Sequence, residues 1–583
     1  MDTQTLTKKA QDYIKFEQDS FFRGQVEELL KNQDWTELND RFFKDLDFGT
    51  GGLRGVIGGG YNRINPFTVQ RATQGLANYI VKTAESGKGG AVIAYDSRNF
   101  SDLFALQAAL VLCANGIKTY LFTSLRPTPE LSFAVRKLGA AAGIVVTASH
   151  NPPEYNGYKV YWNDGAQVVA PHDKAIIEEV TAVGDTVKTM SREEAAAAGF
   201  LVMIDKEVDK PFIEMVKNCS IRPELVREHG KDLKVVYTPL HGTGTMPVES
   251  ALRDMGIEVI FVEEQKIPDG NFPTVDYPNP EEASAMKLAL ELGKKVGADL
   301  IMGTDPDADR MGIAAPDKGE FVLITGNQLG ALLADYIFSG RKEMGTLPAK
   351  PAFIKTIVTT ELQRLIAEEY GAVCFDTLTG FKYIGEKIRE FESQKDGPSY
   401  IVGGEESYGY LVNTEVRDKD AVSAATMSAE MALYHRTQGR TLLDQLRIIW
   451  KKHGYFQETL ISKTFKGESG LKTMKELMEK LRKNPPSVFA GQKVTEVKDY
   501  QNGTTFYPAA GTRENNIDLP SSNVLQFVLE DKSVVTARPS GTEPKVKFYA
   551  SCRSQAGMEL DAAMKIVSGK IEAITAQLNS FVD

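Results

Sequence analysis

The sequence predicts an α/β protein with three consecutive αβ domains, whose sheets are mixed and largely parallel, and a smaller C-terminal α+β domain. In a recurring pattern, a short apolar strand runs into a polar loop bearing glycine or proline, and a helical segment follows. Strands that alternate with helices of ten or more residues indicate α/β layering with largely parallel pairing. In addition, a chain of 583 residues is too long for one hydrophobic core and should divide into several domains.

The strand pattern predicts where the domains lie. The expected strands are at 91–95, 143–146, 235–238, 300–304, 353–358 and 400–403. After a lysine-rich helical stretch near 466–484, several short strands over 504–550 and one helix over 557–581 indicate a different, smaller domain. The expected domains are 1–205 (a helical extension with αβ domain 1), 206–325 (αβ domain 2), 326–458 (αβ domain 3) and 459–583 (α+β domain 4).

The composition excludes several classes of protein. The apolar share of 42% and the charged share of 25% are typical of a soluble globular protein. A net charge of −10 disfavours general nucleic-acid binding, but a local cluster of Arg and Lys still allows small anionic substrates. The four cysteines lie far apart and form no zinc or disulfide pattern. With no signal-peptide core and no membrane-length apolar run, we expect a cytoplasmic protein that does not bind membranes.

A serine stands where the strand at 143–146 ends, in the segment Thr147-Ala-Ser149-His150-Asn-Pro-Pro. The prolines prevent a helix from starting at once and hold the residue before them in an extended conformation. Ser149 should therefore lie on a stiff loop at the carboxyl end of a strand, where open α/β sheets bind their ligands. It is a candidate nucleophile, although Ser, Asn and Pro are also the residues of ordinary turns.

Three aspartates alternate directly after the strand at 300–304, in the segment Asp305-Pro-Asp307-Ala-Asp309-Arg310. In an extended loop, residues two apart point to the same side at roughly 7 Å separation, so these carboxylates repel unless a cation lies among them. Oxygen ligands favour Mg²⁺ or Ca²⁺. An EF-hand is excluded because its glycine and glutamate positions hold arginine and proline here. The pattern predicts a metal site that a phosphate oxygen completes, with Arg310 beside the phosphate.

Further loops carry groups that suit a sugar phosphate. Arg-Pro-Ser-Gly-Thr at 538–542 offers a guanidinium, hydroxyls and an open backbone to a phosphate, and it lacks the Walker pattern. Gly-Glu-Glu-Ser at 404–407 ends a strand and suits sugar hydroxyls, with cations nearby at 417–419 and a small polar loop at 379–382, although each of these segments alone is more typical of a solvated loop. The glycine-rich loop at 48–55 presents one arginine and lacks the dinucleotide-binding spacing.

Together these motifs resemble the α-D-phosphohexomutase superfamily. The serine segment is similar to its phosphoserine loop, the aspartates to its metal loop, 404–409 to its sugar-recognition loop and 538–544 to its phosphate loop. They follow the family's order, one in each domain. The loops at 48–55 and 378–385 are most similar to the longer phosphoglucomutase/phosphopentomutase branch, and the Glu-Glu-Ser form is most similar to the glucose-phosphate enzymes.

The resemblance implies domains arranged around a central cleft and a reversible phosphoryl shift between glucose 1-phosphate and glucose 6-phosphate. A phosphorylated serine and glucose 1,6-bisphosphate would be the intermediates, one Mg²⁺ per chain the cofactor, and small sugar phosphates the partners, while the oligomeric state stays open. Catalysis is implied for Ser149, His150, Lys159, Arg54 and Arg310. Metal binding is implied for Ser149, Asp305, Asp307 and Asp309. Substrate binding is implied for Thr379, Gly380, Lys382, Glu405, Ser407, Lys419, Arg538, Ser540, Gly541 and Thr542.

Other functions remain open on the sequence. Within the family they are phosphopentomutase, phosphomannomutase and glucose 1,6-bisphosphate synthase. An aspartate-nucleophile phosphatase is a more distant alternative, because an apolar strand leads into Asp305-x-Asp307, but Asp309 departs from that family's motif. A non-catalytic sugar-phosphate-binding protein would need a broken motif, and all four motifs are intact.

Overall fold

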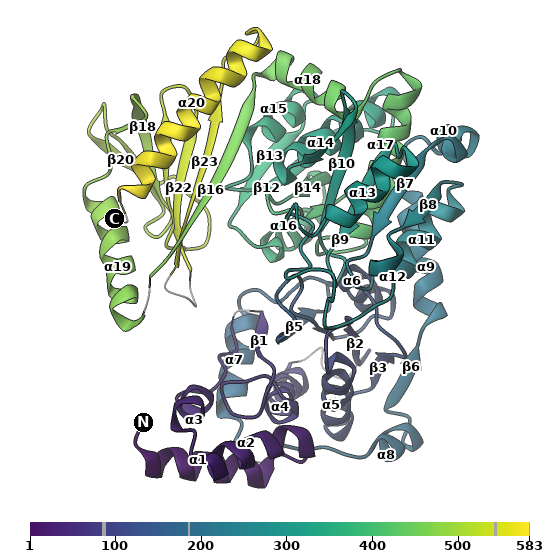
Figure 1. Cartoon of the computed structure of the whole chain (residues 1–583), viewed down its shortest axis with the longest axis vertical. Helices are drawn as coiled ribbons and strands as arrows, with labels where there is room; N and C mark the ends of the chain where they lie inside the picture. The colour runs from purple at the N-terminus through teal and green to yellow at the C-terminus, as the bar shows by residue number, and fades with distance from the viewer. Residues whose placement is uncertain (50, 84–88, 185–186, 466, 541–544, 582–583) are drawn as a thin grey trace.

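The computed structural model describes the whole chain except residues 50, 84–88, 185–186, 466, 541–544 and 582–583. The described residues form four sheets in chain order, and the three N-terminal helices and the C-terminal helix lie at opposite ends of the molecule (Figure 1). Helices flank the first three sheets, which mix parallel and antiparallel pairing, and the fourth sheet is antiparallel. The predicted fold class is confirmed.

Three helices precede the first sheet: α1 (Thr3–Phe16), α2 (Ser20–Asn32) and α3 (Trp35–Phe42). Each begins after an aspartate whose side chain accepts hydrogen bonds from N–H groups of the first turn. Their apolar faces enclose Tyr13, Val26 and Phe42, and Phe67 of the next helix packs on this cluster. The N-terminal extension is therefore a small helical layer fastened to domain 1.

Domain 1 contains a six-stranded sheet in the order β1-β5-β4-β2-β3-β6. Its strands are β1 (Gly52–Val56), β2 (Ala91–Tyr95), β3 (Thr119–Phe122), β4 (Ala142–Val146), β5 (Tyr155–Trp162) and β6 (Leu201–Ile204), and its helices are α4 (Pro66–Lys82), α5 (Ser101–Ala114), α6 (Thr128–Lys137), α7 (His172–Ala182) and α8 (Arg192–Ala197). β2, β3, β4 and β6 pair in parallel, whereas β5 and β1 are antiparallel additions at one edge. Every residue of β4 is buried, as expected for a central parallel strand covered on both faces.

Domain 2 contains a five-stranded sheet in the order β11-β10-β9-β7-β8. Its elements are α9 (Lys206–Asn218), α10 (Pro223–His229), the 3-10 helix η1 (Gly230–Asp232), β7 (Lys234–Thr238), α11 (Thr245–Asp254), β8 (Glu258–Phe261), α12 (Glu263–Lys266), α13 (Lys287–Val296), β9 (Leu300–Thr304), β10 (Met311–Asp317) and β11 (Glu320–Ile324). The turn from β9 into the antiparallel β10 is the segment with the three aspartates.

Domain 3 contains the sheet β13-β12-β14-β15. Its elements are α14 (Gly326–Glu343), β12 (Pro351–Thr356), α15 (Glu361–Glu369), β13 (Val373–Thr377), α16 (Phe381–Ser393), β14 (Ser399–Gly404), β15 (Tyr410–Leu411), α17 (Ala421–Thr437) and α18 (Leu442–His453). The Gly-Glu-Glu-Ser segment connects β14 to β15.

Domain 4 is an antiparallel sheet covered by one long helix. Its elements are β16 (Phe456–Thr464), α19 (Gly467–Lys483), β17 (Val488–Phe489), β18 (Gln492–Asp499), β19 (Thr504–Tyr507), β20 (Thr512–Glu514), β21 (Leu525–Leu529), β22 (Val534–Pro539), β23 (Lys545–Arg553) and α20 (Leu560–Asn579). Figure 1 shows α20, in yellow, lying along the sheet, where it packs on β16 and β23. The expected boundary at 458 falls inside β16, which pairs with β23 along its whole length.

The loop after β9 joins three domains. The carbonyl of Asp307 accepts a hydrogen bond at 2.9 Å from the N–H of Thr128 in domain 1. From domain 3, the N–H of Ala421 donates to the carbonyl of Ala308 at 3.2 Å, and Arg310 forms a β-bridge with Gly409. This loop is therefore fixed in place by backbone contacts with domains 1 and 3. None of the described helices has the length and apolar character needed to cross a membrane.

The helical extension offers a matched pair of neighbouring phenylalanines. Phe42 is fully buried, whereas Phe43 is 47% exposed. We expect Phe42→Ala to lower the free energy of opening of α1–α3 by about 3–5 kcal/mol, because it leaves a cavity among aromatic rings. Phe43→Ala should change it by no more than about 0.5 kcal/mol. Amide hydrogen exchange over residues 1–45 measures both, and equal losses would contradict this description of the helical layer.

Candidate active site

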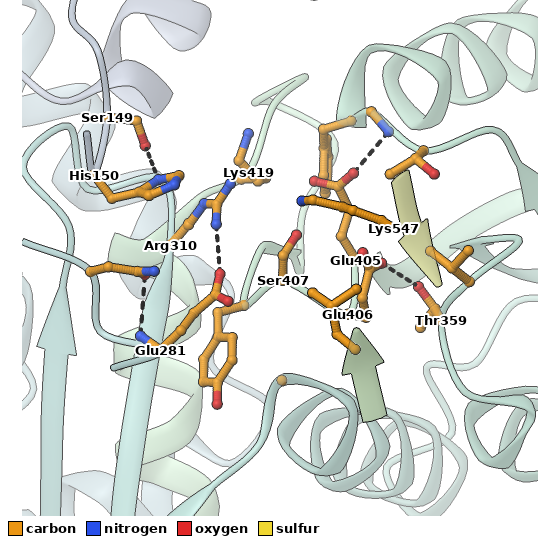
Figure 2. Close-up of a pocket in the computed structure, with 18 of the residues that line it drawn as sticks. Ser149, His150, Glu281, Arg310, Thr359, Glu405, Glu406, Ser407, Lys419 and Lys547 are labelled. Atoms are coloured by element: carbon orange, nitrogen blue, oxygen red, sulfur yellow. Dashed lines mark hydrogen bonds and ion pairs between the residues drawn. The ribbon is translucent and has the colours of Figure 1, made fainter. Parts of the chain in front are cut away.

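A cavity of about 1030 Å³ lies where the four domains meet. Twelve of the residues singled out from the sequence line it: Arg54, Ser149, His150, Lys159, Asp309, Arg310, Thr379, Gly380, Glu405, Ser407, Lys419 and Arg538. Figure 2 shows Ser149 and His150 on one side of the cavity and Glu405, Glu406 and Lys547 on the other, with Arg310, Lys419 and Ser407 between them. Residues as far apart in the chain as Arg54 and Arg538, which are 484 positions apart, thus share one cavity.

The remaining predicted residues have other positions. Asp305 and Asp307 are fully buried beneath the cavity surface. Lys382 lines a smaller neighbouring cavity of about 200 Å³, which Thr379 and Arg538 also line. Ser540 follows β22, and its N–H donates to the carbonyl of Lys545 at 2.7 Å. Gly541 and Thr542 lie outside the described residues.

Ser149 occupies a strained turn after β4. Its φ is +53°, a left-handed conformation that costs a residue with a side chain of order 1–2 kcal/mol. The N–H of Ser149 donates to the hydroxyl of Thr147 at 2.8 Å, and that hydroxyl donates to Asp96 at 2.6 Å. The Oγ atom of Ser149 donates to Oδ2 of Asp305 at 2.6 Å and lies 3.1 Å from Nδ1 of His150. The serine hydroxyl is therefore directed at Asp305, the first of the three aspartates that follow β9 in domain 2.

Arg98 binds the backbone of the serine turn, and the sequence motifs did not identify it. Its guanidinium donates to the main-chain carbonyls of Ser149, Asn151, Pro152 and Tyr155. The side chain is fully buried, and its Nε lies 3.5 Å from Asp96. The strand pattern could have identified it. Asp96 and Arg98 follow β2, and β2 is the parallel neighbour of β4, so both residues lie at the same edge of the sheet as the serine.

The three aspartates form a buried cluster with unsatisfied oxygens. One ligand atom from each of Asp305, Asp307 and Asp309 lies within 4.8 Å of the others. Oδ1 of Asp307 and Oδ1 of Asp309 are buried without a hydrogen-bond partner. Burial, reinforced by the other two carboxylates, raises the pKa of Asp305 well above its ordinary value. Orphaned carboxylate oxygens at this spacing fit a hard divalent cation, so the site can hold a metal ion.

Cations from two other domains partly balance these carboxylates. Nζ of Lys159 in β5 lies 2.9 Å from Asp307 and 3.5 Å from Asp309. Nζ of Lys419 in domain 3 lies 3.0 Å from Asp309. Burial by itself lowers the pKa of Lys159, but Asp307 and Asp309 outweigh it and raise the pKa above its ordinary value. Both lysines are therefore held in the charged form.

His150 differs from these lysines, because its surroundings favour the neutral form. Burial lowers its pKa to about 2, and the nearby charges of Arg310 and Arg54 act in the same direction. The imidazole beside the serine is therefore neutral at physiological pH. Arg310 itself is held by Glu281, whose Oε1 accepts its hydrogen bond at 2.6 Å (Figure 2). Glu281 lines the cavity and was not found from the sequence, because it lies outside every motif.

Two consecutive glutamates form part of the opposite wall. Oε1 of Glu405 accepts a hydrogen bond from the N–H of Gly380 at 2.9 Å. Oε2 of Glu406 accepts from the hydroxyls of Thr356 at 3.1 Å and Thr359 at 3.4 Å. Burial raises the pKa of Glu406 to about 7, and the negative charge of Glu405 adds to the effect. The pair offers acceptor groups and, near neutral pH, one carboxyl that exchanges its proton.

Domain 4 contributes a row of cations. Arg538 in β22 pairs in register with Lys547 in β23, and Lys545 lies two residues before Lys547. All three line the cavity. Burial lowers the pKa of Lys547, and the charges of Arg538 and Lys545 lower it further. An anion bound here would relieve this repulsion, so the strand face is suited to a phosphate. The two lysines were missed, although their alternation after the phosphate motif was a visible signal.

Four consecutive segments of the chain match the domains of one protein family. Residues 45–186, 210–319 and 325–453 match the phosphoglucomutase/phosphomannomutase α/β/α domains I, II and III, and residues 477–564 match the C-terminal domain. The chain is 38% identical to a phosphoglucomutase of Staphylococcus aureus over 91% of this chain and 93% of that relative. It is 37% identical to a phosphoglucomutase of Staphylococcus haemolyticus over 93% of this chain and 95% of that relative.

Two solved structures share the fold. A putative phosphomannomutase from Thermus thermophilus aligns with a TM-score of 0.67 at 22% identity, over 92% of this chain and 99% of that chain. The open form of parafusin, a phosphoglucomutase from Paramecium, aligns with a TM-score of 0.69 at 19% identity, over 92% of this chain and 95% of that chain. At these identities the likeness concerns the fold, and it extends over all four domains.

The raised pKa of Glu406 gives a test of the cavity wall. Between the ordinary value of 4.5 and about 7, the folded chain keeps this proton while the unfolded chain has lost it. The stability of the folded state therefore falls as pH rises through this window, by of order 1–3 kcal/mol. We expect Glu406→Gln to remove this dependence, so that its melting temperature exceeds that of the wild type increasingly from pH 5 to pH 8. The exposed Glu415→Gln is the control; parallel curves for all three proteins would contradict the assignment.

Proposed function

The chain belongs to the phosphoglucomutase/phosphomannomutase family, and on that premise we propose that it interconverts glucose 1-phosphate and glucose 6-phosphate. The observation that carries the proposal is the hydrogen bond from Ser149 Oγ to Asp305 at 2.6 Å, at one side of a cavity whose other walls carry glutamates and cations. This arrangement supports a phosphoryl group on the serine, sugar hydroxyls on the glutamates and a second phosphate on the cations of domain 4.

In this reaction Ser149 stores the phosphoryl group. The phosphorylated serine gives it to the free hydroxyl of glucose 1-phosphate, which forms glucose 1,6-bisphosphate. The bisphosphate turns over in the cavity, and its other phosphate returns to Ser149. One phosphoryl group thus leaves the serine and one comes back, so the enzyme is regenerated and no phosphate is lost to water. Glucose 1,6-bisphosphate also charges the serine of an unphosphorylated chain.

Asp305, Asp307 and Asp309 would hold one Mg²⁺ together with an oxygen of the serine phosphate. The buried Oδ1 atoms of Asp307 and Asp309 support this assignment, because neither of them accepts a hydrogen bond. When bound, the ion offsets the negative charge that develops on the transferring phosphoryl group. Arg54 and Arg310 are proposed to contact the same group; both line the cavity, and the ion pair between Arg310 and Glu281 supports the orientation of Arg310.

His150 and Lys159 are proposed to handle the protons of the transfer. Nδ1 of His150 lies 3.1 Å from the serine oxygen, and Nζ of Lys159 lies 2.9 Å from Asp307 of the metal cluster. The pair resembles the acid and base that a reversible transfer between two hydroxyls requires, each acting in both directions of the reaction.

The opposite wall is proposed to hold the sugar and its non-reacting phosphate. Glu405, Ser407, Thr379 and Gly380 supply acceptors and donors for ring hydroxyls in either orientation of the sugar. Lys419, Arg538, Lys382 and the loop with Ser540, Gly541 and Thr542 are proposed to bind the distal phosphate, joined by Lys545 and Lys547. A phosphate of about −2 charge needs several fixed cations, and domain 4 provides them in one strand pair.

Ser149→Ala tests the central claim. We expect it to lower the turnover of glucose 1-phosphate to glucose 6-phosphate at least about 1,000-fold, because the stored phosphoryl group has no attachment site. A coupled assay with added glucose 1,6-bisphosphate measures the rate, and far-UV circular dichroism should stay unchanged. The same assay with ribose 1-phosphate separates a phosphopentomutase from a phosphoglucomutase. Full activity in Ser149→Ala would overturn the proposal.

Asp307→Asn tests the metal site. The substitution keeps the shape of the side chain and removes one charge from the cluster, so we expect Mg²⁺ to bind at least about 10-fold more weakly. Isothermal titration with Mg²⁺ measures the affinity, and the Mg²⁺ concentration for half-maximal activity should rise in parallel. Asp12→Asn on the exposed face of α1 is the matched control. Equal Mg²⁺ affinity in the two variants would place the metal elsewhere.

A further inference from the structure

We infer that Arg98 is a positioning residue for the serine hydroxyl. We also infer that Phe272, which contacts Arg98 from domain 2, supports Arg98 in this role. The inference rests on the proposed function, in which Ser149 carries the phosphoryl group. Neither residue contacts the cavity, so their effect on the reaction is exerted through the serine turn and the loops that hold it.

The guanidinium of Arg98 spans the whole turn. One terminal nitrogen donates to the carbonyls of Pro152 at 2.8 Å and Tyr155 at 3.0 Å. The other donates to the carbonyl of Ser149 at 2.5 Å and to that of Asn151. A planar fork with several fixed N–H groups can reach four carbonyls at once, whereas the ammonium of a lysine is a single point. Arginine is therefore required at this position by geometry and by charge.

The bond to the Ser149 carbonyl acts where the backbone is strained. Ser149 has φ at +53°, which a serine adopts only when its surroundings hold it there. This conformation directs Oγ at Asp305 across the domain boundary. Without the hydrogen bond from Arg98 to this carbonyl, the peptide would relax to a less strained conformation. The Ser149 hydroxyl would then no longer point at Asp305. Arg98 thus converts a turn with several accessible conformations into one.

Phe272 covers one face of this guanidinium. The centre of its ring lies 5.0 Å from the Cζ atom of Arg98, within the range of a cation–π contact, and the side chain is only 1% exposed. Phe272 itself has φ at +47°, a second strained residue in the same contact. A ring in this position excludes water from the guanidinium, which strengthens its bonds to the carbonyls.

The loop that contains Phe272 packs closely on the loop between β2 and α5. A Cβ atom on Gly270 would lie 2.5 Å from the main-chain N of Asn99, so only glycine allows this approach. The side chain of Asn99 donates to Asn271 at 3.0 Å. The same connection between α12 and α13 also carries Glu281, the partner of Arg310. One segment of domain 2 therefore positions both the serine turn and the arginine beside the transferring group.

Phe272→Leu tests this device with little change in volume. We expect kcat with glucose 1-phosphate to fall roughly 3- to 20-fold, because a cation–π contact to a desolvated arginine is lost. KM should stay within about twofold, since the sugar-binding wall is untouched. Phosphorylation of Ser149 by glucose 1,6-bisphosphate, followed by intact-mass measurement, should slow by the same factor as kcat. Arg98→Lys should lower both rates roughly 100-fold.

The matched control is Phe456→Leu, because Phe456 is also buried and lies 5.0 Å from the guanidinium of Arg553 in domain 4. It should match the wild type in kcat even if its melting temperature falls as far as that of Phe272→Leu. The double variant Arg98→Lys/Phe272→Leu should be no slower than Arg98→Lys alone, because the two residues act as one unit.

The outcomes separate the two claims. If the wild type takes up no phosphate on Ser149, the proposed function fails. If it does, and Phe272→Leu has the kcat and phosphorylation rate of the wild type, the inference is overturned. Independent, multiplying effects of the two substitutions would also overturn it, since Phe272 would then act through something other than Arg98.

Discussion

Three carboxylates buried within 4.8 Å of one another are the constraint on which the rest of the structure depends. Such a cluster is unstable unless cations and donors surround it. Domain 1 supplies Lys159 and the hydroxyl of Thr128, and domain 3 supplies Lys419. The same need for compensation brings Ser149 against Asp305. The convergence of three domains on one loop is therefore an electrostatic requirement of that loop.

The local arrangement of charged groups in the cavity matters more for this reaction than the net charge of the chain. The chain carries −10 overall, yet its substrates are anions. Arg538, Lys545 and Lys547 form a local positive face on domain 4, and Arg310 forms another beside the serine. Glu405 and Glu406 lie on the same side of the cavity as Lys547, and Ser407 lies between that side and Ser149 (Figure 2). Each end of a bisphosphate thus has its own set of cations.

Three of the loops that meet at the cavity each contain a residue with a strained backbone. Ser149, Ala308 and Tyr408 each have a positive φ, although none of them is glycine. They belong to the serine loop, the metal loop and the sugar loop, and each makes a hydrogen bond to a residue of another domain. Left-handed residues persist only where the surrounding structure over-determines them. The rigid geometry that phosphoryl transfer requires therefore depends on packing between domains.

The sequence by itself predicted the α/β class, the strands that end in polar loops, and the segments of the serine, metal, sugar and phosphate motifs, while the roles of their residues came from the family resemblance. These predictions rest on local sequence patterns: an apolar strand, a turn residue and aspartates two positions apart can each be recognised within a few residues. Only the tertiary structure decided that Arg98, Glu281, Phe272 and Lys547 belong to the same machinery, and that Lys382 lines a separate small cavity. Their partners lie as far as 174 positions away, as with Arg98 and Phe272, and an ion pair or ring contact across that distance leaves no pattern in one sequence.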